Sequence, residues 1–195
     1  MDKAIFIDKD GVINENLYEV DGVIMSPATL DQVRILDYVK EGIDKLKEDG
    51  FKIVIITNQP GLAFGYISID NFNKISEFLK KELGIDAIYF CPHHPTKGKV
   101  GEYVKKCECR KPSPFLLHKA CKEMNLDVWG SYMVGDSLSD IQTGNAWGVK
   151  KTFLIGAIRE DIIQIQHTKG IFPDYTCKNL LEVANKIREI ENNSI

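Results

Sequence analysis

The sequence predicts an α/β fold with a doubly wound, mainly parallel sheet covered by helices on both faces. Its short apolar runs are continuous rather than alternating, which indicates strands buried on both sides. Segments with helical spacing of apolar residues lie between these runs. This β-α-β rhythm is typical of parallel sheets with right-handed crossovers.

Five runs are expected to form strands, at residues 4–7, 53–57, 87–90, 132–134 and 151–155. Helical patterns occupy residues 39–46, 72–83, 117–124, 140–147 and 180–190. Gly50, Gly84 and Gly148 follow three of these patterns, where a helix end favours glycine. No internal repeat or linker-like segment divides the chain, so we expect one domain over residues 1–195. Two long irregular stretches, about residues 14–37 and 92–114, are interpreted as elaborations of that domain.

Composition excludes several classes of protein. The 195 residues are 44% hydrophobic, which is enough to bury a core without disulfides. The net charge of -3 gives no basic excess for nucleic acid. No apolar stretch approaches the roughly 18 residues of a membrane helix, and no signal-peptide pattern opens the chain. We therefore expect a soluble cytoplasmic protein. A compact single domain is able to act alone, so we also expect a monomer.

The first predicted strand is followed by two carboxylates, Asp8 and Asp10, and then by Gly11. In open parallel sheets, ligands bind outside the carboxyl ends of the strands. A carboxylate pair at such a strand end is able to bind a hard cation and to supply a nucleophile and an acid/base. The run Asp-x-Asp-Gly also occurs in calcium loops and ordinary turns, so taken alone it fits either interpretation.

Polar residues follow two further strands. Thr57 and Asn58 come after the second, where a hydroxyl and backbone N–H groups are able to hold phosphate oxygens. Asp136 follows the fourth and is able to reach the same cation as Asp8. Asp140 either favours the helix N-terminus electrostatically or acts as a partner within the site. A polar strand end without function is the alternative for Thr57.

Arg110 and Lys111 precede Pro112, which is suited to starting the next helix. Lys111 is able to place a positive charge beside a phosphate and to neutralise the nearby carboxylates. The alternative is a solvated basic pair on a loop.

Four side chains in the second irregular stretch form a candidate metal site: Cys91, His93, Cys107 and Cys109. Three thiolates and one imidazole suit tetrahedral Zn²⁺, and a set with no open position indicates a structural role. His94 is an alternative fourth ligand, and free buried thiols are the alternative to a metal. The odd number of cysteines argues against a disulfide framework.

In order and spacing, these motifs resemble the four motifs of the haloacid dehalogenase (HAD) superfamily over residues 4 to 155. The resemblance implies a Rossmann-like core and a phosphatase in which Asp8 is the nucleophile and Asp10 the general acid/base. It implies that Mg²⁺ is held by Asp8, the backbone carbonyl of Asp10 and Asp136. It further implies that Thr57 and Lys111 hold the transferring phosphoryl group, with Asn58 also counted among the substrate-binding residues.

The cysteine loop is similar to that of one subfamily. Cys-Pro-His-His-Pro followed by Cys-x-Cys-Arg-Lys-Pro resembles the D-glycero-D-manno-heptose 1,7-bisphosphate phosphatases, with histidinol-phosphate phosphatases as near relatives. The resemblance implies a cap-less enzyme with a zinc-binding loop, a small sugar phosphate as substrate, and a substrate contact for Arg110. Lys9 stands where Arg is usual, and Phe64 stands where the family pattern has a basic residue. The alternatives are a histidinol-phosphate phosphatase and a non-catalytic, zinc-stapled binding protein.

Overall fold

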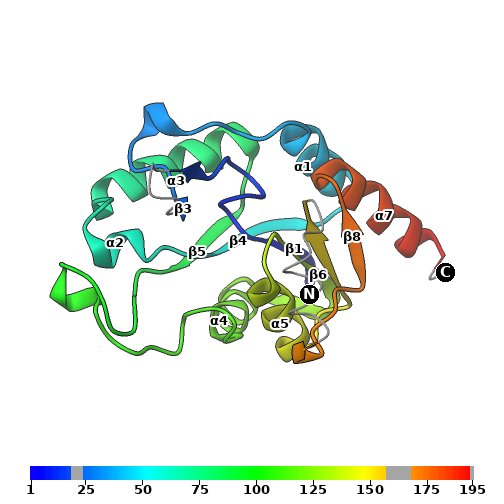
Figure 1. The fold of residues 1–195 in the computed structure, drawn as a ribbon. Helices are drawn as coiled ribbons and strands as arrows, with labels where there is room; N and C mark the ends of the chain where they lie inside the picture. Colours follow the sequence, from blue (N-terminus) through cyan, green and yellow to red (C-terminus); the bar gives the residue numbers. More distant parts are fainter. Residues whose placement is uncertain (19–23, 157–167, 194–195) are drawn as a thin grey trace.

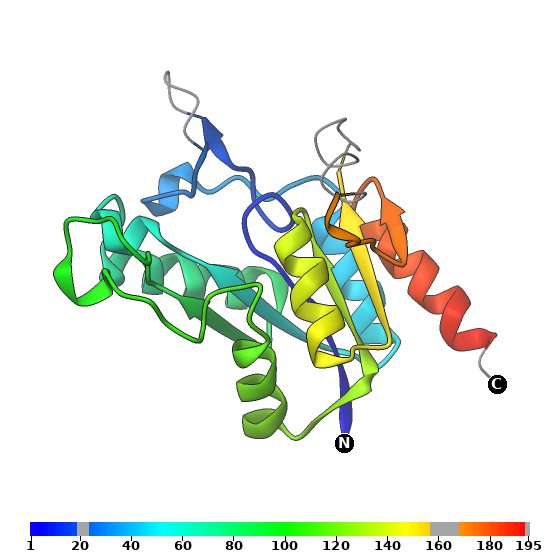
Figure 2. The ribbon, with the colours of Figure 1, turned by 60° about the horizontal axis from the view of Figure 1, so that its bottom comes forward.

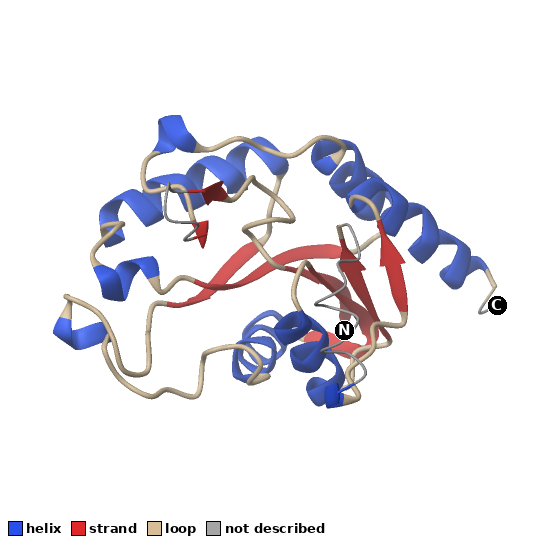
Figure 3. Cartoon of the chain, viewed as in Figure 1, coloured by secondary structure: helices blue, strands red, loops and turns tan. Residues whose placement is uncertain are grey.

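The computed structural model describes residues 1–18, 24–156 and 168–193. A six-stranded sheet within these residues has the order β5-β4-β1-β6-β7-β8, and every pairing in it is parallel. Its strands are β1 (Asp2–Ile7), β4 (Lys52–Asn58), β5 (Ala87–Cys91), β6 (Leu126–Gly135), β7 (Lys151–Ile155) and β8 (Tyr175–Cys177). Figures 1 and 3 show the sheet running through the middle of the molecule with helices on both sides. The predicted fold class is confirmed.

The helices divide between the two faces because side chains alternate along each strand. Ile5 and Ile7 of β1 pack into the core beneath one group of helices, whereas Ala4 and Phe6 pack into the core on the other face. The first group is α1 (Val39–Glu48), α3 (Ile69–Leu83) and α7 (Leu180–Asn192), and the second is α4 (Phe115–Met124) and α5 (Leu138–Trp147). Burial on both faces explains why the strand sequences are continuously apolar.

Several short elements lie near the carboxyl ends of the strands. They are the antiparallel pair β2 (Leu17–Tyr18) and β3 (Ile24–Met25), the helix α2 (Gly61–Phe64), and the 3-10 turns η1 (Leu30–Gln32) and η2 (Gly101–Tyr103). Figure 2 shows these segments gathered on one side of the sheet. All of them except α2 belong to the two stretches interpreted as elaborations, of which residues 19–23 lie outside the described residues.

Three of the differences between these elements and the sequence prediction have a clear physical reason. β6 begins at Leu126, well before the predicted start at residue 132, because its first half pairs with the start of β1. β8 was not predicted because its three residues carry no continuous apolar run. α5 begins at Leu138 rather than Asp140, because Ser137 and Asp140 form a capping box around its first turn.

The C-terminal helix is tied to the sheet through Glu191. Its carboxylate accepts hydrogen bonds from Tyr132 at 2.6 Å, from Lys150 at 2.8 Å and from Lys3 at 2.6 Å. Burial acts to raise the pKa of Glu191, but the hydrogen bonds from Lys150, Lys3 and Tyr132 outweigh it and lower the pKa to about 2. In the described part of the chain, no helix is both long enough and apolar enough to cross a membrane.

Candidate active site

Asp8 leaves the end of β1 beside the end of β6, where its backbone N–H donates to the carbonyl of Val134 at 2.9 Å. This pairing brings Asp8 next to Asp136, which follows the last residue of β6. Asp140, in the first turn of α5, completes the group. Carboxylate oxygens from these three residues lie within 4.8 Å of one another. Asp8 and Asp136, which were predicted from the sequence to reach the same cation, are therefore neighbours.

Lys111 lies at the centre of this group. Its Nζ is 2.7 Å from Asp8 Oδ1 and 2.5 Å from Asp140 Oδ1, and it donates to the carbonyl of Ile56 at 2.9 Å. Burial alone would lower the pKa of Lys111, but the charges of Asp140 and Asp8 outweigh it and raise the pKa above its ordinary value. Lys111 thus stays charged although it is only 4% exposed.

Asp140 satisfies both interpretations left open by the sequence. Its Oδ2 accepts from the backbone N–H of Ser137 at 3.1 Å and from the Ser137 hydroxyl at 2.6 Å, which caps α5. Its Oδ1 faces Lys111. The chain approaches it closely at Gly135, where a Cβ would lie 2.2 Å from the Cβ of Asp140. A glycine is therefore required at that strand end.

The carboxylates repel one another in the absence of a cation. Burial raises the pKa of Asp8 to about 6, and the charges of Asp140 and Asp10 act in the same direction. Burial also raises the pKa of Asp136 to about 7, with further contributions from Asp8 and Asp140. One lysine does not balance three carboxylates. A cluster of carboxylate oxygens with excess negative charge fits a hard divalent cation such as Mg²⁺.

Gly11 makes room for that cluster. It has φ of 83°, and a Cβ there would lie 2.0 Å from Asp136 Oδ2. Glycine has no Cβ and tolerates this positive φ, so the chain is able to turn sharply after Asp10.

The Asp10 carboxylate points toward a different set of partners. Oδ1 accepts from Lys9 Nζ at 2.6 Å and from Asn14 Nδ2 at 2.9 Å. Oδ2 accepts from Ser26 Oγ at 2.7 Å and from Gln59 Nε2 at 2.6 Å. Burial acts to raise the pKa of Asp10, but Lys9 and the hydrogen bonds outweigh it, so the pKa lies below its ordinary value.

None of these four donors has a role predicted from the sequence. Lys9 and Gln59 are close sequence neighbours of predicted site residues at strand ends. That proximity could have marked them as candidate site residues. Ser26 follows β3 within an irregular stretch, and no spacing pattern connects it with Asp10.

Thr57 and Asn58 end β4 beside Lys111. The Thr57 hydroxyl is 1% exposed and accepts from Gln59 Nε2 at 3.1 Å. Asn58 holds the backbone of Lys111 from both sides: its Oδ1 accepts from the Lys111 N–H at 3.0 Å, and its Nδ2 donates to the Lys111 carbonyl at 3.3 Å. In this arrangement the Asn58 amide aligns Lys111, and its predicted substrate contact stays a prediction.

The four predicted zinc ligands also converge. Cys91 Sγ lies 3.5 Å from Cys107 Sγ and 3.7 Å from His93 Nδ1, which lies 3.3 Å from Cys109 Sγ. Ligands around tetrahedral Zn²⁺ are separated by roughly 3.5–3.8 Å, given Zn–S and Zn–N bonds of about 2.3 and 2.0 Å. All four donor atoms lie within 4.8 Å of one another, and the cysteines are unpaired thiols. The donor set therefore fits zinc.

His94 does not belong to that cluster. Its Nδ1 accepts from the backbone N–H groups of Thr96 at 3.3 Å and Lys97 at 2.9 Å. Arg110, which directly follows Cys109, donates from NH1 to the carbonyl of His93 at 3.2 Å. The cysteine cluster is thereby linked to the residue before Lys111.

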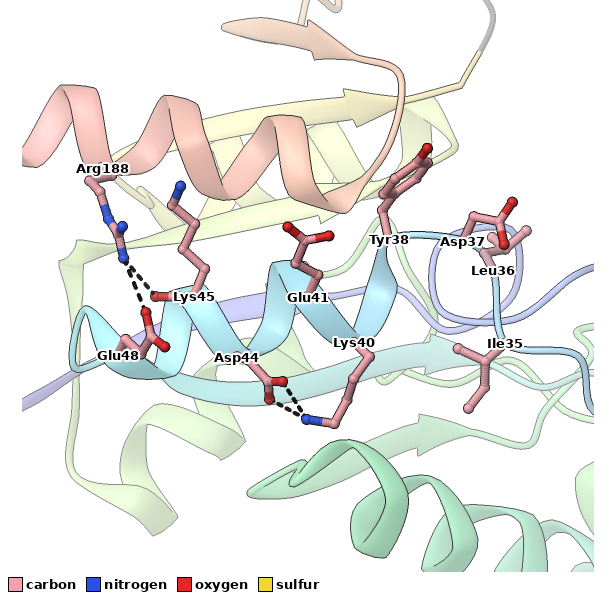
Figure 4. A pocket seen from close by; sticks show the side chains of 10 residues that line it. All are labelled: Ile35, Leu36, Asp37, Tyr38, Lys40, Glu41, Asp44, Lys45, Glu48 and Arg188. Atoms are coloured by element: carbon pink, nitrogen blue, oxygen red, sulfur yellow. Dashed lines mark hydrogen bonds and ion pairs between the residues drawn. The ribbon is translucent and has the colours of Figure 1, made fainter.

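A separate depression of about 710 Å³ lies between α1 and α7. Figure 4 shows its walls, which carry the ion pairs of Lys40 with Asp44 and of Arg188 with Glu48. None of the predicted site residues lines it.

Comparisons with known proteins agree with this geometry. The model of the haloacid dehalogenase-like hydrolase family matches residues 14–148. The D-glycero-beta-D-manno-heptose-1,7-bisphosphate 7-phosphatase of Pasteurella multocida is 41% identical over 160 residues, which are 80% of this chain and 82% of that protein. The enzyme of the same name from Escherichia coli K12 is 36% identical and covers 78% of each chain.

Among solved structures, the D,D-heptose 1,7-bisphosphate phosphatase of B. bronchiseptica with magnesium and phosphate aligns with a TM-score of 0.75. It is 27% identical over 96% of this chain and 99% of that one.

Proposed function

The chain belongs to the haloacid dehalogenase-like hydrolases, within the heptose-bisphosphate phosphatase family, and is a phosphomonoesterase of that type; from this we propose that it removes the 7-phosphate of D-glycero-D-manno-heptose 1,7-bisphosphate through a phosphorylated Asp8. The observation that carries the proposal is the position of Asp8, whose carboxylate lies 2.7 Å from the Lys111 ammonium and close to Asp136 at the end of the adjacent strand. The names of relatives 36–41% identical support the heptose ester over histidinol phosphate.

In the first step, an oxygen of Asp8 attacks phosphorus and the bond to the sugar oxygen breaks. Asp10 donates a proton to that leaving oxygen. Lys111 stabilises the charge on the transferring group, since a buried ammonium is a fixed positive charge in a medium of low dielectric. The Thr57 hydroxyl, at the end of the neighbouring strand, is assigned to a phosphoryl oxygen.

In the second step, Asp10 takes a proton from water as the water oxygen attacks the phosphorus of phospho-Asp8. The bond to Asp8 breaks, and inorganic phosphate leaves. Asp8, the carbonyl of Asp10 and Asp136 are assigned to Mg²⁺, which when bound supplies charge neutralisation and orients the phosphate. Asp140 holds Lys111 through the ion pair between Nζ and Oδ1.

Zinc is assigned to the cluster of Cys91, His93, Cys107 and Cys109, with a structural role. It fixes the loop that leads into Arg110, to which we assign a contact with the substrate. Residues 1–195 are proposed to act as one cap-less catalytic domain and as a monomer.

Phosphate release from heptose 1,7-bisphosphate, heptose 7-phosphate and histidinol phosphate tests the proposal. The expected result is Mg²⁺-dependent release from the bisphosphate, with loss of the phosphorus-31 NMR signal of the 7-phosphate and retention of the anomeric one. Asp8→Asn is expected to abolish release. Preferential hydrolysis of histidinol phosphate, or full activity in Asp8→Asn, contradicts the proposal.

A further inference from the structure

Phe64, at the end of α2, is the middle of three contacting rings. Its ring stacks on Tyr66 with centroids 5.4 Å apart and planes inclined by 20°. The centroid of the His94 ring lies 5.0 Å from that of Phe64, with the two planes inclined by 50°. Because His94 Nδ1 accepts from two backbone N–H groups, its proton is assigned to the other ring nitrogen. We call His94, Phe64 and Tyr66 the aromatic row.

A small pocket of about 100 Å³ lies beside the aromatic row. It is lined by Met25, Ser26, Pro60, Gly61, Phe64, Tyr66 and Ile67. None of these lining residues, all of which the structure describes, carries a charge. The pocket is formed by the segment after β3 and the segment after β4, so it lies on the side of the sheet where ligands of parallel sheets bind.

The pocket is connected to the acid/base through two hydrogen bonds. Ser26, which lines it, donates to Asp10 Oδ2 at 2.7 Å. Gln59, which directly precedes Pro60 in the wall, donates to the same oxygen at 2.6 Å. Asp10 is the group assigned to protonate the leaving oxygen. The alcohol part of the substrate must therefore lie next to Asp10. The pocket begins at Ser26, which contacts Asp10 directly.

We propose that the aromatic row and this pocket form the subsite for the sugar ring of the leaving group, and that they recognise its C–H face rather than a second phosphate. The inference rests on the proposed function, because it needs Asp10 to mark the leaving-group side. An uncharged lining rich in aromatic and aliphatic side chains packs against the C–H groups of a sugar, whereas it offers an anion no pairing partner. Phe64 is thus a specificity-determining residue.

The test compares kcat/KM for heptose 1,7-bisphosphate, heptose 7-phosphate and glycerol 3-phosphate. In the wild type, removal of the anomeric phosphate is expected to change kcat/KM by less than about tenfold, since no charge faces it in this subsite. Phe64→Ala is expected to lower the preference for heptose 7-phosphate over glycerol 3-phosphate by about 3- to 10-fold, the scale of one lost aromatic contact. Tyr66→Ala is expected to act in the same direction.

Trp129→Ala is the matched control, because this aromatic residue is 79% exposed and lies in β6 away from the pocket. Thermal unfolding of each variant separates loss of folding from loss of recognition. Tyr66 is 48% exposed, so Tyr66→Ala should disturb the core less than Phe64→Ala does. Phe64→Arg is expected to shift the preference of the enzyme toward the bisphosphate.

Two results would overturn the inference while leaving the proposed function intact. One is a loss of more than tenfold when the anomeric phosphate is removed from the wild-type substrate. The other is a sugar preference within twofold of wild type in folded Phe64→Ala and Tyr66→Ala. Absence of wild-type activity on both heptose esters contradicts the proposed function itself, and the inference with it.

Discussion

Lys111 and Asp140 form a buried ion pair in which Nζ lies 2.5 Å from Oδ1. The pair joins the loop after β5 to the first turn of α5, and it leaves the same ammonium free to face Asp8 at 2.7 Å. Lys111 therefore both connects its loop to α5 and places a positive charge beside Asp8.

Asp140→Asn is expected to lower the free energy of unfolding by on the order of 1–2 kcal/mol, because an amide binds Lys111 and Ser137 more weakly than a carboxylate does, whereas Asp8 remains as a counter-charge for Lys111. Urea denaturation measures the change. Asp44→Asn is the matched control, since its ion pair with Lys40 is half exposed and such pairs contribute under about 1 kcal/mol. Equal effects of the two substitutions would contradict the assigned role of the buried pair.

The double variant Asp140→Leu with Lys111→Met is expected to lose activity, because the phosphoryl group loses its cation. Removal of both partners avoids a buried lysine beside a missing carboxylate, but Asp8 loses its counter-charge and α5 loses its cap, so stability is expected to stay below that of the parent. We expect phosphate release to fall by at least about 100-fold, as for loss of one electrostatic donor. Substantial activity in the folded double variant would exclude Lys111 from the chemistry.

Ser26→Ala is expected to lower kcat by roughly 5- to 10-fold with little change in KM for a ring-free phosphate ester, because one hydrogen bond orients Asp10. Ser68→Ala is the matched control. Ser68 caps α3 by accepting from the N–H of Asn71. Its replacement is therefore expected to lower the free energy of unfolding by about 1 kcal/mol and to leave the activity unchanged. A normal kcat in Ser26→Ala would show that Asp10 needs no such support.

One equivalent of zinc is expected per chain, and Cys109→Ser is expected to lose it. Structural zinc stabilises the fold directly, so the melting temperature should fall. Activity should fall as well, since Arg110 and Lys111 directly follow Cys109. Cys121→Ser, outside the cluster, should retain zinc and activity. A zinc-free preparation with unchanged melting temperature and activity would remove the structural role.

Glu191→Gln is expected to destabilise the protein by about 1–2 kcal/mol at pH 7, through weaker hydrogen bonds to two lysines. The folded pKa of Glu191 is lowered from 4.5 to about 2. Its stabilisation is therefore complete above about pH 4.5 and is lost as the pH falls through about 2. In urea titrations, the difference in free energy of unfolding between parent and variant should narrow as the pH falls over that range. A difference that stays constant would contradict the assignment. Glu189→Gln, an exposed pair with Lys186, is the control.

The sequence predicted the parts of the site that strand ends determine. Asp8, Thr57 and Asp136 follow buried apolar runs, and parallel pairing brings such ends to one edge of a sheet. The zinc cluster was predictable because thiols and imidazole at close spacing indicate a metal.

Contacts across irregular segments were not predictable in the same way. Ser26 reaches Asp10 only because the β2–β3 pair folds back over the end of β1, and no periodicity encodes that path. Asp140 has two roles because one carboxylate has two oxygens, which the pattern of residues alone does not reveal. β8 is too short and too exposed to carry a strand signal.

Acid quenching during turnover of heptose bisphosphate labelled with phosphorus-32 at position 7 reveals whether Asp8 is phosphorylated. We expect label on the peptide that contains Asp8, released by hydroxylamine as for an acyl phosphate, and absent from Asp8→Asn. Steady phosphate release with no labelled protein at any quench time, or label on a different residue, would contradict this expectation.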